Sequence, residues 1–459
     1  MSDAVTPVVR VIDKYVDLLC LHDAHPDRYP CFLESVAHGN AQARFDILFA
    51  FPDERIALPQ DFRLESEGVE NSQGDFLKYF DQLWLQNYQK VYVDPDIPFY
   101  GGWFMYLGYE LASQVEPALK LYPDQDSRIP IAFAQRFPAA VIRDHALKKT
   151  IVVAETQHAE KLAALKHDVD SCPSACETDI SLSLGNVLEE DPSAFLHAVD
   201  RIRHYIVEGD VFQVNLSRRW QAELAGQEIS AARLFASLRK TNPAPFAGLY
   251  VSDDYAIISS SPERLVCVKD SMVETRPIAG TRPRGDKSSA DFRLSQTLLN
   301  HPKERAEHIM LIDLERNDLG RVCVAGSVKV NELMVVESYA HVHHIVSNVR
   351  GVLGNSVTPG QVLRAVFPGG TITGCPKVRC MQIIAELEQA HRGPYTGSMG
   401  YINHDGNMDF NILIRTMVRE EGSLTFRAGA GIVADSIAEK ELKETRDKAK
   451  GMLLSLGLH

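Results

Sequence analysis

The sequence predicts an α+β fold, in which strand-rich and helix-rich segments mix without a regular alternation. Short apolar runs bounded by glycine, proline and aspartate are typical of strands and hairpins, and several longer stretches have the apolar spacing of amphipathic helices. The two kinds of segment do not follow one another as repeating strand–helix–strand units, which favours α+β over a doubly wound parallel sheet. With 459 residues, the chain can bury a large core.

An N-terminal region, residues 1–160, is expected to be rich in strands. Residues 156–190 begin with a helical pattern and end in a polar stretch with Ser, Pro and Asp, which is typical of a junction. Apolar segments between turn-forming residues predict strands or hairpins at 43–54, 98–111, 139–144 and 148–155.

A larger second region, residues 190–459, mixes both kinds of element. Amphipathic spacing predicts helices at 193–210 and 436–456. Runs rich in β-branched and aromatic residues predict strands at 255–261, 272–280 and 327–349.

The composition excludes several classes of function. Lys and Arg number 48 and Asp and Glu 61, so the formal net charge is −13. Such an acidic chain is a poor candidate for binding nucleic acid or an anionic membrane, although a few placed cations suffice for a small anionic substrate. There is no basic segment followed by an apolar run at the N-terminus and no apolar stretch of membrane-spanning length. We therefore expect a cytoplasmic protein whose eight scattered cysteines are reduced.

Two pairs of carboxylates are spaced to share helix faces. Glu441, Glu444 and Lys448 are three and four residues apart in the C-terminal helix, and Glu304 and Glu307 are three apart at the start of another predicted helix. Carboxylate oxygens are the ligands that Mg²⁺ prefers. The spacing alone fits either a metal site or two solvated helix faces with Glu–Lys pairs.

Two glycine-rich stretches and a histidine cluster are further candidates. Residues 367–377 precede an amphipathic segment and fit an anion cradle at a helix N-terminus, and residues 428–435 follow a strand-like run; each also fits a tight turn. In a strand, His341 and His343 share one face and His344 the other, so the three cannot all reach one metal ion.

These segments together resemble a known family, the chorismate-utilising enzymes, which include anthranilate synthase component I, aminodeoxychorismate synthase component I, and the isochorismate and salicylate synthases. The resemblance covers nearly the whole chain and its motifs appear in family order. They are FLESVAHGNAQARFDILFAFP, PFYGGWFMYLGYEL, GDVFQVNLSRR, SSSPERL, TRPIAGTRPRG, ERAEHIMLIDLERNDLGR, VHHIVS, FPGGTITGCPKVRCMQII, GSMGY, AGAGIVADS and EKELKETRDKAK. The family fold that this implies is a β-sandwich core flanked by helices, with the active site in the cleft and the two regions intertwined.

The resemblance also implies roles for individual residues. Glu307 and Glu444 correspond to ligands of Mg²⁺, with Glu304 and Glu441 acting through water or behind them. Glu263 corresponds to the general acid/base, and His344 and Thr371 to further catalytic groups. The residues that correspond to substrate-binding groups are Tyr401, Arg415, Gly429, Ala430, Gly431 and Lys448. Glu34 and Ser35 match a tryptophan-binding motif of some relatives, so we expect a tryptophan pocket in the N-terminal region.

The nucleophile is predicted from Gln213. The isochorismate and salicylate enzymes have at this position a lysine that activates water, and a glutamine amide cannot act as a base at neutral pH. Ammonia is therefore the expected nucleophile. No segment resembles a glutaminase, so the resemblance implies a separate glutaminase (amidotransferase) subunit that supplies ammonia.

Two ammonia-using branches remain, and position 279 bears on the choice. Many aminodeoxychorismate synthases carry a lysine there that attacks the ring; this chain has Ala279, within a PIAGT run that resembles anthranilate synthase. Four longer stretches, GDVFQVNLS, ARFDILFAFP, NELMVVESYAHVHHIVS and FPGGTITGCPK, are nearer the aminodeoxychorismate branch. We therefore expect amination of chorismate to 4-amino-4-deoxychorismate, a precursor that an aminodeoxychorismate lyase converts to p-aminobenzoate for folate. The alternative is anthranilate synthase component I, which releases pyruvate.

Overall fold

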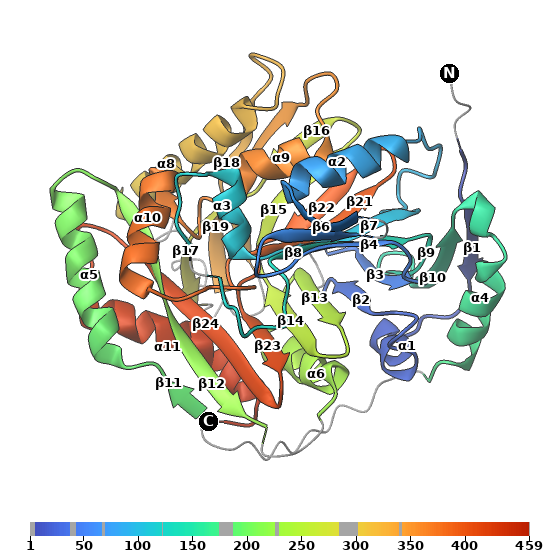
Figure 1. The fold of residues 1–459 in the computed structure, drawn as a ribbon, viewed down its shortest axis with the longest axis horizontal. Helices are drawn as coiled ribbons and strands as arrows, with labels where there is room; N and C mark the ends of the chain where they lie inside the picture. The colour runs from blue at the N-terminus through green and yellow to red at the C-terminus, as the bar shows by residue number, and fades with distance from the viewer. Residues whose placement is uncertain are drawn as a thin grey trace, which may run out of the picture.

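The fold consists of two large antiparallel sheets with helices packed on their outer faces (Figure 1). The computed structural model describes residues 5–36, 43–66, 69–121, 123–173, 187–224, 229–283, 302–338 and 342–458. The family resemblance predicts an α+β architecture, and this arrangement confirms it.

The first sheet has twelve strands in the described part of the chain. Strands of the N-terminal region form one half of it and strands of the C-terminal region the other, joined where β2 pairs with β13. In sheet order the strands are β1 (Val8–Ile12), β10 (Lys149–Ala154), β9 (Ala139–Asp144), β3 (Phe45–Ala50), β2 (Cys31–Glu34), β13 (Phe246–Val251), β14 (Tyr255–Ser261), β23 (Thr416–Glu420), β24 (Ser423–Ile432), β12 (Gln213–Glu223) and β11 (Val187–Glu189), with β20 (Gly374–Cys375) also paired to β12.

The second sheet also has twelve described strands and is likewise built from both regions. Its strands are β17 (Ile278–Pro283), β19 (Val342–Val352), β16 (Met272–Thr275), β15 (Arg264–Lys269), β22 (Met408–Asn411), β21 (Ser398–Asn403), β7 (Gly102–Leu107), β8 (Ala132–Phe137), β4 (Arg55–Leu58), β5 (Arg63–Ser66) and β6 (Val69–Gln73), with β18 (Lys329–Ser338) paired to β19.

The two sheets face each other across an aromatic core. Phe49 of the first sheet packs edge-to-face on Phe104 of the second, and Phe133 of the second lies 4.4 Å from the ring of Tyr250 of the first. All four side chains are buried. Apolar side chains that meet between two facing sheets are the pattern of a β-sandwich.

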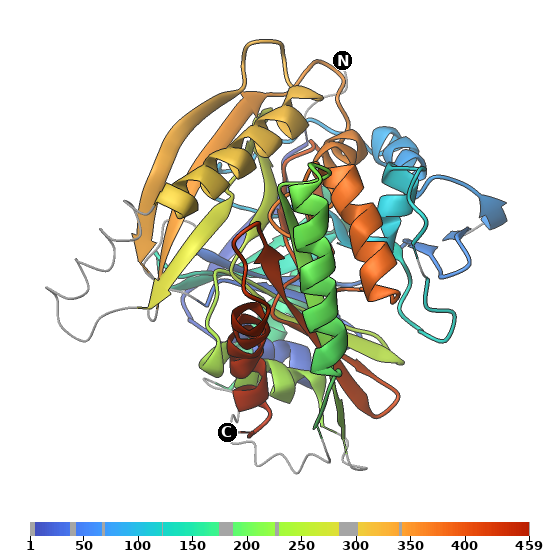
Figure 2. The same cartoon turned by 90° about the vertical axis from the view of Figure 1, so that its left-hand side faces the viewer.

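Helices cover the outer faces and one end of the sandwich (Figure 2). Against the first sheet pack α1 (Leu18–Ala24), α4 (Lys161–Ser171), α6 (Ala231–Thr241) and α11 (Ala438–Ser455). Against the second pack α2 (Phe76–Gln86), α3 (Ala112–Val115), α8 (Pro302–Gly320), α9 (Pro359–Val366) and α10 (Lys377–Glu388). Helix α5 (Pro192–Val207) packs with α10 and α11 over β12 and β24. Helices α8 and α11 both lie at the left-hand end of the molecule in Figure 1, α8 in its upper part and α11 in its lower part, and Figure 2 shows this end from the front.

Several local predictions agree with the structure. The segments at 139–144 and 148–155 form the hairpin β9–β10, the segment at 193–210 overlaps nearly all of α5, and the segment at 436–456 contains α11. The glycine-rich residues 428–431 form no tight turn, because they belong to β24 and pair with β12 along its length. The expectation of eight reduced cysteines is wrong: Cys20 is disulfide-bonded, although six others are free.

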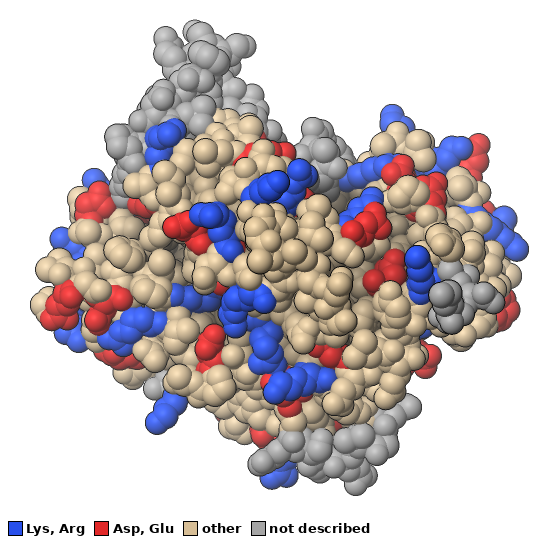
Figure 3. Space-filling view, turned by 90° about the horizontal axis from the view of Figure 1, so that it is seen from above, with Lys and Arg blue, Asp and Glu red and all other residues tan. Residues whose placement is uncertain are grey.

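The length of the helices and the charge of the surface concern binding to membranes and nucleic acids. No helix among the described residues is both long and apolar enough to cross a bilayer. On the face shown in Figure 3, basic and acidic side chains occur together.

Candidate functional site

The floor of the candidate site is formed by β12 and β24. These strands pair in register, Asn215 with Gly431 and Ser217 with Gly429. A Cβ on Gly431 would stand 2.6 Å from Gln213 Nε2, and one on Gly429 would stand 2.6 Å from Tyr395 Oη. The two glycines therefore let polar side chains approach the strand closely, which no larger residue permits.

Helix α11 places a lysine over this floor. Lys448 Nζ donates a hydrogen bond to the Gly429 carbonyl at 3.0 Å and forms an ion pair with Glu444 at 2.8 Å. Glu441 lies one turn earlier on the same helix. The predicted proximity of Lys448, Glu444 and the glycine-rich strand is thus observed, because a helical spacing of four residues stacks the two side chains.

Glu263 lies in the link between β14 and β15, where two hydrogen bonds hold its backbone. Its N–H donates to Ser261 Oγ at 3.2 Å and its carbonyl accepts from Ile412 N at 3.0 Å. Burial raises the pKa of the Glu263 carboxyl to about 7, although neighbouring groups oppose this shift. Those groups are Thr371, the backbone N–H of Ile278, Lys448 and Arg415. A carboxyl with a pKa near 7 can both donate and accept a proton at neutral pH.

Arg415 provides a second positive charge at the site. It lies between β22 and β23 with φ +51°, a left-handed conformation that is uncommon for a residue other than glycine. Burial lowers the pKa of its guanidinium, and the nearby Glu263 opposes this effect. A partly buried cation beside a carboxyl whose pKa is near 7 retains positive charge for an anionic ligand.

The turn that contains Thr371 packs closely against α8. A Cβ on Gly370 would stand 2.4 Å from Leu314 Cδ2 of that helix. The Thr373 hydroxyl donates to the Gly369 carbonyl at 2.9 Å and the Gly374 N–H to the Gly370 carbonyl at 3.1 Å. The predicted glycine-rich stretch therefore forms a compact turn that holds Thr371 beside Glu263.

The remaining predicted residues lie on β17, β19 and α8. His344 is buried in β19 and pairs with Thr281 of β17. Glu307 lies on α8, which packs on β17 and β19. Ala279 belongs to β17 and Glu304 to α8, but the side chains of both lie outside the described part of the chain, as does His341.

The donor set for a metal is in part present. Glu307 and Glu444 offer hard oxygen ligands on the two helices α8 and α11, which suits Mg²⁺ held by one or two carboxylates with the rest of its shell from water and substrate. Among the described residues, however, no three His, Cys, Asp or Glu side chains lie close enough together to hold an ion. Glu307 and Glu444 thus have the donor chemistry that Mg²⁺ requires, but the described residues form no closed cage around an ion.

Tyr401 lies away from this group. It is on β21, with its ring 6.4 Å from Phe49 and 5.9 Å from Phe99. It lines a cavity between the sheets. The tyrosine that contacts the floor of the candidate site is Tyr395, which sequence reasoning missed. Both tyrosines lie in the run GPYTGSMGY, and their spacing does not tell which of the two faces the site.

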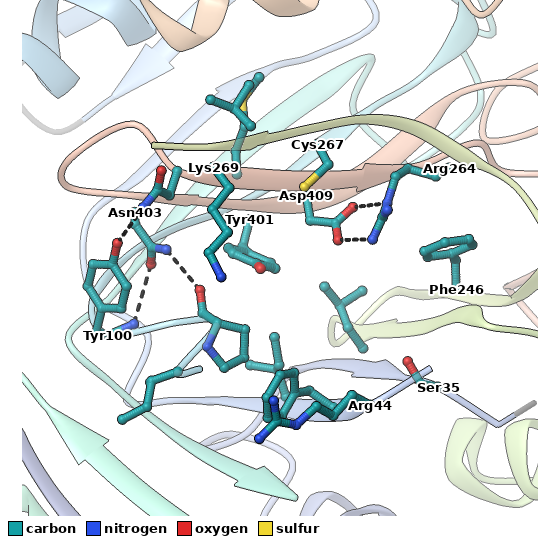
Figure 4. A pocket seen from close by; sticks show the side chains of 18 of the residues that line it. Ser35, Arg44, Tyr100, Phe246, Arg264, Cys267, Lys269, Tyr401, Asn403 and Asp409 are labelled. Atoms are coloured by element: carbon teal, nitrogen blue, oxygen red, sulfur yellow. Dashed lines mark hydrogen bonds and ion pairs between the residues drawn. The ribbon is translucent and has the colours of Figure 1, made fainter. Parts of the chain in front are cut away.

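The cavity that contains Tyr401 has a volume of about 510 Å³ and is a separate feature of the sandwich (Figure 4). Glu34 and Ser35, the predicted tryptophan-pocket residues, line it together with Arg44 and Phe246. On its opposite wall Arg264 forms two hydrogen bonds to Asp409, at 2.9 and 2.8 Å. Glu34 carries a buried oxygen without a hydrogen-bond partner in the described structure. Burial raises the pKa of Glu34 to about 8.

Comparison with known proteins identifies relatives over nearly the whole length. The family described as chorismate binding enzyme matches residues 35–454. Aminodeoxychorismate synthase component 1 of Bacillus subtilis is 39% identical over 397 residues, 84% of this chain and 83% of that protein. Anthranilate synthase component 1 of Thermus thermophilus is also 39% identical, over 434 residues, 92% of this chain and 90% of that protein. The crystal structure of anthranilate synthase component I from Streptococcus pneumoniae superposes with a TM-score of 0.79 at 34% identity, covering 90% of this chain and 93% of that chain.

Proposed function

Because the chain belongs to the chorismate-binding enzyme family, we propose that it is the synthase component that aminates chorismate at carbon 4. The observation that carries the choice of nucleophile is Gln213, whose side-chain amide lies against Gly431 in the floor of the site. An amide cannot take a proton from water at neutral pH. Ammonia needs no such base, because its lone pair is already nucleophilic.

The proposed reaction converts chorismate and ammonia to 4-amino-4-deoxychorismate and water. The bond between carbon 4 and its hydroxyl oxygen breaks, and Glu263 gives the departing oxygen a proton. A bond forms between carbon 4 and the ammonia nitrogen, which then releases a proton that restores Glu263. The pKa of about 7 suits a group that must be protonated in one step and ionised in the next. His344 and Thr371 are proposed as the accompanying catalytic side chains.

Arg415 and Lys448 are proposed to bind the two carboxylates of chorismate. Both are cations close enough to Glu263 to act on its charge. Lys448 donates to the strand floor, so its ammonium group is fixed in direction. Paired cations of this kind bind a dianionic substrate in a protein whose net charge is −13.

Magnesium is the proposed cofactor. Glu307 and Glu444 would hold it, with Glu304 and Glu441 acting through water or behind the two ligands. When bound, Mg²⁺ would polarise the substrate oxygens and neutralise its carboxylate.

The position of amination rests on sequence stretches spread along the chain. GDVFQVNLS, ARFDILFAFP, NELMVVESYAHVHHIVS and FPGGTITGCPK resemble the aminodeoxychorismate branch. Ala279 favours the second candidate, anthranilate synthase component I, because alanine offers no nucleophile for a covalent route. In the reaction proposed here ammonia therefore attacks the ring directly.

A glutaminase subunit is the proposed partner and ammonia source, and an aminodeoxychorismate lyase would use the product. The test is product analysis by liquid chromatography with mass detection. The purified chain is incubated with chorismate, Mg²⁺ and an ammonium salt at alkaline pH, with and without added lyase. We expect p-aminobenzoate only when the lyase is present. Anthranilate and pyruvate without the lyase would establish the second candidate in its place.

We also propose that the inter-sheet cavity binds tryptophan. Its volume of about 510 Å³ lies in the range of small-ligand pockets, and Glu34 offers an acceptor for an α-amino group. Calorimetric titration with L-tryptophan tests this, with L-alanine as the control. Equal responses to both amino acids, or none, would contradict it.

A further inference from the structure

Asn242 contacts the guanidinium of Arg415. Asn242 ends helix α6 and its Oδ1 accepts a hydrogen bond from Arg415 Nη1 at 3.2 Å. Within the described ranges this is the one hydrogen bond of the Arg415 side chain, and no described carboxylate forms an ion pair with it, although Glu263 lies near enough to act on its charge. The direction of this partly buried cation therefore depends on a neutral amide.

Ser260 connects the same two residues through their backbones. Its N–H donates to the Arg415 carbonyl at 3.1 Å, and its hydroxyl donates to the Asn242 carbonyl. Residues from α6, β14 and the link before β23 are thus closed into one ring of hydrogen bonds. Helix α11 supports it, because a Cβ on Gly451 would stand 3.3 Å from the Asn242 side chain. The ring holds Arg415 in its left-handed backbone conformation.

A neutral acceptor has a specific consequence here. An aspartate at position 242 would have nearly the same shape, but it would pair with Arg415 and neutralise its charge. Asparagine holds the guanidinium and leaves its charge available to an anion. We infer that Asn242 is a positioning residue that directs Arg415 toward a carboxylate of the substrate, an inference that rests on the proposed function.

The test compares chorismate binding and turnover for Asn242→Asp and the wild type. Asn87→Asp is the matched control, because Asn87 also ends a helix, α2, but is exposed and far along the chain from the site. We expect Asn242→Asp to raise the KM for chorismate about tenfold to a hundredfold with a smaller change in kcat, since one charge-assisted contact is lost. Asn87→Asp should leave KM and kcat within about twofold. Asn242→Ala, which removes the acceptor without adding charge, serves if the aspartate variant does not fold.

A double-mutant cycle separates positioning from a general structural effect. If Asn242 acts through Arg415, Asn242→Asp should weaken chorismate binding in the wild-type background but change it less than about twofold beside Arg415→Gln. Equal effects in both backgrounds, or no effect in the wild type, would overturn the inference. The proposed function fails separately, if the wild-type chain itself neither binds nor aminates chorismate.

Discussion

The side-chain amide of Gln213 lies against the backbone of Gly431, in a space that a single methyl group would fill. A Cβ on Gly431 would stand 2.6 Å from Gln213 Nε2. The contact fixes where the amide lies relative to the paired strands β12 and β24. The glutamine at position 213 can therefore take this place only because position 431 is a glycine.

Gly431→Ala should reduce amination of chorismate more than it reduces stability. The new methyl group meets the end of a flexible side chain, so Gln213 is displaced while the strand is kept. We expect kcat/KM to fall about tenfold and the free energy of unfolding to fall by about 1 kcal/mol. Steady-state kinetics and urea unfolding measure the two. Gly320→Ala, at a glycine with open space around it, is the control; an equal loss of activity in both variants would contradict this account.

Tyr395 and Tyr401 should differ in their effect on the reaction. Tyr395 Oη occupies the space where a Cβ on Gly429 would stand, whereas Tyr401 is on β21 and lines the inter-sheet cavity. We expect Tyr395→Phe to lower kcat/KM for chorismate about tenfold and Tyr401→Phe to change it less than twofold. The opposite result would restore the prediction from the family resemblance.

Local periodicity predicted part of this site and long-range pairing decided the rest. The contact of Lys448 with Glu444 follows from helical spacing and could be read from the sequence. The course of residues 428–431 could not, because their extended form depends on pairing with β12, more than 200 residues earlier. Tyr395 was missed for a similar reason. The turn before it is held by Arg392, which donates to the carbonyls of Asn215 and Ile372.

Glu307→Gln and Glu444→Gln should each remove nearly all Mg²⁺-dependent turnover. Glutamine keeps the size of the side chain but loses the anionic oxygen that Mg²⁺ requires. The mid-point of thermal unfolding should rise for the wild type when Mg²⁺ and chorismate are added together, and should not rise for either variant. Glu439→Gln, in the first turn of α11, is the control. If either variant kept near-full activity, the metal ligands would have to be sought elsewhere.

Glu263→Gln should make the protein more stable at alkaline pH. Burial raises the pKa of Glu263 from 4.5 to about 7, so the folded state binds this proton more tightly than the unfolded state. The stabilisation is full below about pH 4.5 and is lost as pH rises through about 7. Ionising the buried carboxyl then costs up to about 3 kcal/mol.

Glutamine at position 263 avoids the cost of ionising a buried carboxyl. The free energy of unfolding of the variant relative to wild type should therefore rise by about 1–3 kcal/mol between pH 5 and pH 8 in metal-free buffer. Glu223→Gln, at an exposed position on β12, should show no such rise. Parallel pH profiles for Glu263→Gln and the wild type would mean that the Glu263 carboxyl is as well solvated in the folded protein as in the unfolded chain.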